Sequence, residues 1–110
     1  MSAYYETDDL KKFPNLTRVN KEIGDKFFAY YASAMQEGAL SEREKSLIAL
    51  AVAHALKCPY CIDAYTQTCL EKGADEEQMN EAVHVAAAMA AGITLVHSVQ
   101  MMNKIDELVM

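Results

Sequence analysis

Positive charge is scarce in this sequence, with 10 lysine and arginine residues against 16 aspartate and glutamate residues. The formal net charge of −6 repels the phosphate backbone of nucleic acids and the headgroups of anionic lipids. We take Leu47 to Leu56 as the longest apolar stretch; His54 interrupts it, and it is too short to cross a bilayer. We therefore expect neither a nucleic acid nor a membrane among the partners.

Two other patterns are missing. Residues Met1 to Glu6 lack the basic and then apolar sequence of a secretory signal, which predicts a cytoplasmic protein. No alternating run of apolar and polar residues is bounded by turn signals, so we predict no strands. With 110 residues, 52% of them hydrophobic, the chain is expected to form one folded domain over residues 1–110.

The patterns that are present predict an all-α fold of about five or six helices. Residues 1–18 are polar and contain Pro14, so we expect an N-terminal arm that packs on another surface, which the sequence does not identify. Ser41 with Glu44, and Asp75 with Gln78, have the spacing of capping boxes. Apolar spacing and these caps place helices over about 20–36, 41–56, 58–72, 75–91 and 93–108, with Gly92 as a break or a kink.

Two of these helices are apolar on almost every side, namely the stretches from Leu47 to Leu56 and from Ala82 to Ala91. Both are rich in alanine, which permits close contact between helices. A single small bundle has too little interior to cover both. We therefore expect other copies of the chain to cover part of this surface. The alternative is a monomer with a tight, alanine-rich core.

Only three cysteines are present, and two of them form the motif Cys58-Pro59-Tyr60-Cys61 at a predicted helix start. Two thiols at this spacing can form a disulfide reversibly, and the free amides of a helix N-terminus favour a thiolate there. In a reducing cytoplasm the motif indicates redox or metal chemistry more than a permanent cross-link. A closed zinc site needs four ligands, so we expect no metal and no cofactor. Binding of a soft ion such as arsenic(III) is the alternative.

Three polar residues are candidate helpers for these thiols. Tyr65 follows Cys61 by one helical turn on the same face, where its hydroxyl can hydrogen-bond to a thiolate. His54 precedes Cys58 by four residues and is a candidate proton carrier. The alternative for each is a structural role: Tyr65 as a half-buried aromatic residue with its hydroxyl at the surface, and His54 as a histidine of the core. Ser46 is the third candidate, because it lies on the side of its helix that carries His54. The alternative is a structural role, in which its hydroxyl bonds back to the preceding helical turn.

The remaining cysteine and histidines have weaker support. Cys69 is separated from Cys58 by about 16 Å along one helix, too far for a disulfide, which requires Cα atoms within about 7 Å. We therefore interpret Cys69 as a small buried apolar side chain. The sequence does not fix whether His84 and His97 face the thiols.

These motifs together resemble a known family. The stretches from Leu40 to Ala53 and from Cys58 to Ala64, with Gly73-Ala74-Asp75 downstream, are similar to the alkylhydroperoxidase D-like, carboxymuconolactone decarboxylase family. The resemblance covers about residues 20–98. It implies a helical bundle that assembles as homo-oligomers, trimers or hexamers. Family members with the CxxC pair are thiol peroxidases or disulfide reductases, whereas true decarboxylases generally lack it.

The resemblance also implies roles for residues. Cys61 attacks the peroxide and becomes a sulfenic acid, Cys58 resolves it into a disulfide, and a dithiol reductant protein reduces that disulfide. This sequence departs from the family at two positions that usually form a proton relay. Ser46 stands where a glutamate is usual, and Tyr65 stands where a histidine is usual. Turnover should be slow unless Tyr65, His54 or Glu44 replaces the relay.

The leading hypothesis is therefore a thiol-dependent peroxidase or disulfide oxidoreductase acting on a hydroperoxide or a partner disulfide. A second hypothesis is a dithiol protein that binds or transfers arsenic(III) or another soft ion. The run from Cys58 to Gln67 is similar to peroxidase-like proteins associated with arsenosugar biosynthesis. A third is a non-redox lyase of the decarboxylase type, for which the thiols would be dispensable.

Overall fold

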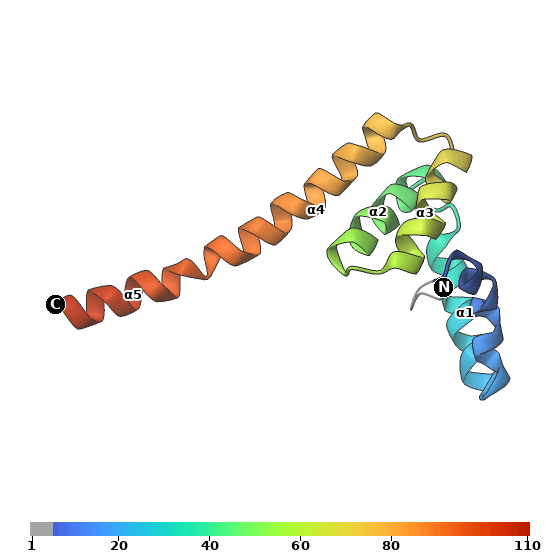
Figure 1. Cartoon of the computed structure of the whole chain (residues 1–110), viewed down its shortest axis with the longest axis horizontal. Coiled ribbons are helices and arrows are strands. Elements are labelled where there is room, and N and C mark those ends of the chain that lie inside the picture. The colour runs from blue at the N-terminus through green and yellow to red at the C-terminus, as the bar shows by residue number, and fades with distance from the viewer. Residues whose placement is uncertain (1–5) are drawn as a thin grey trace.

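The computed structural model describes residues 6–110, and the elements within them are all helices (Figure 1). A 3-10 helix, η1 (Thr7–Arg18), precedes α1 (Lys21–Met35), α2 (Glu42–Ala55), α3 (Pro59–Glu71), α4 (Glu76–Val96) and α5 (Ser98–Val109). The prediction of an all-α fold is confirmed. The first five residues of the predicted N-terminal arm lie outside the described residues.

Both predicted capping boxes are formed. The backbone N–H of Glu44 donates to Ser41 Oγ at 3.0 Å, and the Ser41 N–H donates to Glu44 Oε1 at 2.8 Å. Asp75 and Gln78 make the same reciprocal pair at the start of α4, at 2.8 and 3.1 Å. Each box satisfies amide groups that the first helical turn leaves unpaired. The starts of α2 and α4 are therefore set by local sequence.

The arm is ordered as a 3-10 helix that packs on α1 and α3. Its Phe13 ring meets Phe28 edge to face, with centroids 5.0 Å apart. At Gly24 the two elements approach so closely that a Cβ would lie 2.9 Å from the Cα of Thr17. The described part of the arm therefore packs on this chain's own α1, and it forms one wall beside α3.

The predicted break at Gly92 is wrong. Helix α4 continues through Gly92 to Val96, and the interruption falls at His97, before α5. A single glycine inside a helix costs only about 1 kcal/mol relative to alanine. That cost is too small to end a helix whose hydrogen bonds continue on both sides.

The buried core is small and lies where α2 packs against α3 and α4. Its centre is Leu50, Cys69 and Ala74, with four partly buried side chains packed around it: Leu47, Tyr65, Met79 and Val83. The apolar stretch in α2 is only partly buried within one chain. Ile48, for example, is 50% exposed. Apolar surface therefore remains uncovered even beside the core.

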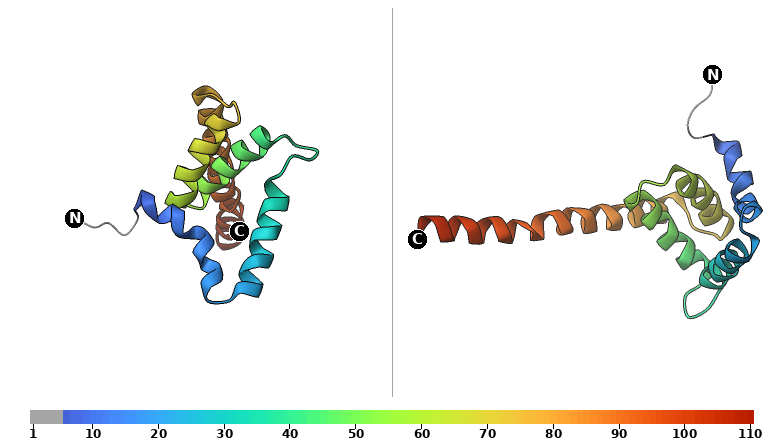
Figure 2. Two further views of the ribbon diagram at one scale, coloured as in Figure 1. Left: turned by 90° about the vertical axis from the view of Figure 1, so that its right-hand side faces the viewer. Right: turned by 90° about the horizontal axis from the view of Figure 1, so that it is seen from below.

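The molecule is extended because α4 and α5 leave the other helices as a long rod (Figures 1 and 2). The radius of gyration is 19.1 Å. A compact domain of about 100 residues has a radius of gyration of about 13 Å. The principal extents are 60 × 39 × 36 Å. Most of the rod lies clear of the rest of the chain.

The rod is also the most apolar part of the chain. Residues Glu76–Val109 contain an 18-residue window with a mean hydropathy of 1.6, none of it buried. The prediction that Leu47 to Leu56 is the longest apolar stretch is therefore wrong. By length and composition this helical segment could cross a membrane, although core helices of soluble proteins meet the same criterion.

Candidate dithiol site

The two cysteines of the CxxC motif lie at the start of α3. Cys58 is the N-cap residue, Pro59 occupies the first turn, and the backbone N–H of Cys61 donates to Cys58 Sγ at 3.3 Å. Lys57 adopts a left-handed conformation, with φ of 59°, and so turns the chain from α2 into α3. Both thiols are free and partly exposed. The helix-terminal amide of Cys61 is thus directed at the sulfur of Cys58.

The thiols lie between two cavities. The first has a volume of about 540 Å³ and is lined by η1, α1 and α3. The second has a volume of about 450 Å³ and is lined mainly by α1 and α2. Apolar side chains dominate both walls, among them Phe13 and Leu16 in the first and Ile48 and Val52 in the second. Four residues are common to both: Tyr31, Cys58, Cys61 and Tyr65.

The environment of Cys61 disfavours a thiolate. Burial, followed by a hydrogen bond and the charge from Cys58, raises the pKa of the Cys61 thiol to about 11. This direction is opposite to the one expected for a thiol at a helix N-terminus. The difference arises mainly because burial disfavours the charged form of Cys61, and the hydrogen bond with Cys58 acts in the same direction. At neutral pH Cys61 is therefore mainly a protonated thiol.

Tyr65 lies beside Cys61, as its position on the helix predicted, but its hydroxyl has another partner. The Tyr65 hydroxyl hydrogen-bonds to the Tyr31 hydroxyl of α1. Burial is the largest cause that raises the pKa of Tyr65; the hydrogen bond with Tyr31 follows, then the charges of Tyr31 and Cys61. The side chain therefore stays a neutral phenol over the physiological pH range.

Sequence reasoning missed Tyr31 as a site residue. It appears in the sequence as one of several aromatic residues on the apolar face of α1, and it is 34 positions from Tyr65. A buried tyrosine hydroxyl usually finds a hydrogen-bond partner. The need of a tyrosine hydroxyl for a hydrogen-bond partner could have drawn attention to Tyr31, but it does not identify Tyr65 as that partner.

The other candidate relay residues are engaged elsewhere. Ser46 is 2% exposed, and its Oγ donates to the carbonyl oxygen of Glu42 at 2.8 Å. His54 Nδ1 donates to the carbonyl oxygen of Leu50 at 2.8 Å. Neither Ser46 nor His54 lines the two cavities. The structure therefore does not bring these two side chains to the thiols.

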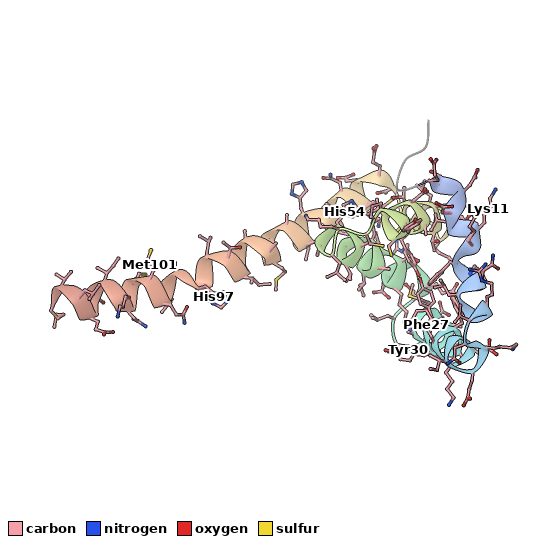
Figure 3. All side chains as sticks on the ribbon, turned by 60° about the horizontal axis from the view of Figure 1, so that its bottom comes forward. Lys11, Phe27, Tyr30, His54, His97 and Met101 are labelled. Atoms are coloured by element: carbon pink, nitrogen blue, oxygen red, sulfur yellow. The ribbon has the colours of Figure 1, made fainter. Side chains whose placement is uncertain are left out.

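The remaining cysteine and histidines lie apart from the site. Cys69 is 0% exposed and belongs to the hydrophobic core, as predicted, and burial raises its pKa. His84 and His97 are exposed on α4 and at its end, where Figure 3 shows His97 on the rod. Among residues 6–110 no group of three or more histidine, cysteine or acidic side chains could hold a metal ion.

The sequence matches the carboxymuconolactone decarboxylase family over residues 21–104, most of the chain. The chain belongs to this family. It is 39% identical over 92 residues to a Paracoccus denitrificans protein described as uncharacterized protein 4 in the cox locus. That match covers 84% of this chain and 83% of the relative.

Two crystal structures resemble this carboxymuconolactone decarboxylase family member, each with 30% sequence identity. One, from Methanobacterium thermoautotrophicum, has a TM-score of 0.75 and covers 80% of this chain and 96% of its own. The other is the apo form of a carboxymuconolactone decarboxylase family protein from Legionella pneumophila, with a TM-score of 0.70 and 84% coverage of both chains. The chain thus shares its helical fold with both of these structures.

Proposed function

We propose that this family member is a thiol-dependent oxidoreductase that cycles Cys58 and Cys61 between a dithiol and a disulfide. The oxidant is a hydroperoxide or a partner disulfide, and the reductant is a dithiol protein. One observation carries the proposal. Two free, partly exposed thiols interact at the start of α3, and both line the same cavity of about 540 Å³.

The chemistry of one cycle balances with these two residues. The Cys61 sulfur attacks the outer oxygen of a hydroperoxide, so that an S–O bond forms and the O–O bond breaks. The Cys61 sulfur gives up two electrons and becomes a sulfenic acid. The Cys58 thiol then displaces water from it and forms the disulfide. A dithiol donor returns two electrons and two protons by thiol–disulfide exchange.

The rate of the first step depends on how much Cys61 is ionised. Only the thiolate is a good nucleophile, and the pKa of about 11 leaves a small thiolate fraction at neutral pH. Neither Ser46 nor Tyr65 can take the proton as the usual glutamate and histidine would. We therefore propose a slow peroxidase, or an enzyme that a partner protein activates by supplying a base.

Stopped-flow measurement with cumene hydroperoxide tests the proposal. We expect the wild type and Cys69→Ala to react at similar rates, because Cys69 lies in the core outside both cavities. Cys61→Ser should abolish the reaction. Cys58→Ser should leave the first step but prevent disulfide formation. Equal rates for the wild type and Cys61→Ser would contradict the assignment.

Capture of arsenic(III) is the second candidate function. The same two adjacent thiols offer two sulfur ligands to a soft ion, and a water or hydroxide can complete the coordination. Calorimetry with arsenite distinguishes it from a role limited to redox chemistry. Binding should disappear in the double variant Cys58→Ser, Cys61→Ser, and binding that survives there would exclude the dithiol as the site.

The lyase chemistry in the family name is the third candidate. The four residues common to both cavities do not favour it over thiol chemistry, because they are two thiols and two phenols. A lyase would keep its activity after both thiols are alkylated. The proposed oxidoreductase would lose all activity under that treatment.

A further inference from the structure

We propose that the hydroxyls of Tyr31 and Tyr65 form a proton-donating pair that serves the dithiol. Tyr65 gives its proton to the alkoxide that leaves when Cys61 attacks a hydroperoxide. Tyr31 is a positioning residue that orients the Tyr65 hydroxyl and returns a proton to it. This inference rests on the proposed oxidoreductase function and adds a device that replaces part of the missing relay.

The positions of the four side chains carry the proposal. Tyr31 from α1 and Tyr65 from α3 hydrogen-bond to each other through their hydroxyls. Together with Cys58 and Cys61, they form the boundary between the two cavities. A hydroperoxide that reaches the sulfur of Cys61 from either cavity is therefore beside the phenol pair. Tyr65 lies one helical turn after Cys61 on α3, and both side chains line both cavities.

Chemistry assigns the pair as a donor and not as a base. Burial and the contact with Tyr31 raise the pKa of Tyr65, so its phenol retains the proton and cannot accept one from a thiol. An alkoxide is far more basic than a phenolate, so transfer from Tyr65 to the leaving oxygen is downhill. As the S–O bond forms, the O–O bond breaks and the alkoxide takes the Tyr65 proton. Tyr31 then protonates Tyr65, and solvent protonates Tyr31.

Both rings are held before the substrate arrives. Tyr31 packs against Phe13 of η1 and Phe27 of α1, with ring centroids 6.1 and 5.8 Å away. Tyr65 packs on the core formed by Leu50, Cys69 and Ala74. Donors fixed in place stabilise developing charge without a reorganisation cost. The arm and the core together therefore orient the pair toward the thiols.

Oxidants with different leaving groups test the pair. Tert-butyl hydroperoxide releases a basic alkoxide, whereas peracetic acid releases acetate, which needs no proton donor. We expect Tyr65→Phe to slow oxidation of Cys61 by tert-butyl hydroperoxide about 100-fold, the lower end of the usual general-acid effect. Tyr31→Phe should slow it about tenfold. Rates with peracetic acid should change less than about threefold in both variants.

Tyr30→Phe is the matched control, because Tyr30 adjoins Tyr31 but is 73% exposed and lines neither cavity. It should react like the wild type with both oxidants. Equal slowing of both oxidants by Tyr65→Phe would overturn the assignment, since it indicates a packing role. Unchanged rates would overturn it as well. A wild type inert toward both oxidants contradicts the oxidoreductase function together with the pair, whereas a reactive wild type tests the pair alone.

Discussion

At the scale of single residues, the two sulfur atoms of the site are chemically unequal. Cys58 Sγ accepts a hydrogen bond from the Cys61 backbone N–H at 3.3 Å. This contact follows from the geometry of an N-cap, in which the first residue of the motif receives the amide of the fourth. Cys61 is disfavoured as an anion, because burial, and after it the hydrogen bond and charge of Cys58, raises the pKa of its thiol to about 11.

The pH dependence of alkylation measures this inequality. We expect the rate at which iodoacetamide modifies Cys61, followed by peptide mass spectrometry, to rise about tenfold per pH unit between about pH 7 and 10. The thiolate fraction grows in that proportion below the pKa of about 11. In Cys58→Ser the apparent pKa should fall, yet stay raised because burial remains. A plateau of the rate below about pH 8.5 would contradict the burial argument.

Sequence and structure agree at this scale only where contacts are local. The CxxC motif, the neighbouring Tyr65 and the buried Cys69 follow from helical spacing. The role of Tyr31 does not follow from helical spacing, because its contact with Tyr65 joins residues that are 34 positions apart and lie on different helices. Ser46 and His54 bond to carbonyls of their own helix, an outcome that the periodicity of α2 allowed but did not decide.

At the scale of elements, the arm η1 determines the shape of the first cavity. It supplies Phe13 and Leu16 to the wall, and it lies directly on α1 at Gly24. Capping residues made the starts of α2 and α4 predictable. The break assigned to Gly92 failed because one glycine does not outweigh a continuous helix. The order of the arm depends on contacts with α1 and α3 and not on its own polar sequence.

Gly24→Ala tests the contact between η1 and α1. The added Cβ would lie 2.7 and 2.9 Å from Cγ2 and Cα of Thr17, so the backbone of η1 must move. We expect the free energy of unfolding to fall by about 1–3 kcal/mol, as overpacking usually costs. Hydrogen–deuterium exchange over residues 7–18 should become faster.

Gly38→Ala is the matched control, because its nearest neighbour, Lys45 Nζ, would be 3.8 Å away from the new Cβ. Its unfolding curve in urea and its exchange over residues 7–18 should match those of the wild type. Equal exchange in Gly24→Ala would show that the arm does not rest on α1 in solution.

At the scale of the whole molecule, the exposed rod of α4 and α5 is the main departure from a compact domain. The sequence predicts that other copies of the chain cover part of this apolar surface, but helical periodicity does not show which residues form that contact, because the stretch from Ala82 to Ala91 is apolar on nearly all sides. We propose that other copies of the chain cover it. The radius of gyration of 19.1 Å and the unburied apolar window in Glu76–Val109 support this.

Ile93→Glu tests that proposal. Ile93 is 58% exposed in the single chain, so a charge there should be tolerated by a monomer but not inside an interface between copies. We expect the wild type to sediment as a homo-oligomer without lipid or detergent. The Ile93→Glu variant should sediment as a smaller species, because the charge disrupts the interface between copies. Gln100→Glu adds the same charge at a polar, exposed position and should remain oligomeric.

A monomeric wild type in analytical ultracentrifugation would contradict coverage by copies of the chain. Sedimentation of that monomer with phospholipid vesicles would instead assign the rod to a membrane.

Mapping the disulfide after one equivalent of cumene hydroperoxide tests the central claim most directly. The reduced protein is oxidised, its free thiols are blocked, and its peptides are analysed without reduction. The account predicts an intramolecular bond between Cys58 and Cys61, an intact thiol at Cys69, and full reversal by dithiothreitol. Free thiols at both Cys58 and Cys61 after oxidation, or a Cys61 sulfinic acid with no disulfide, would contradict it.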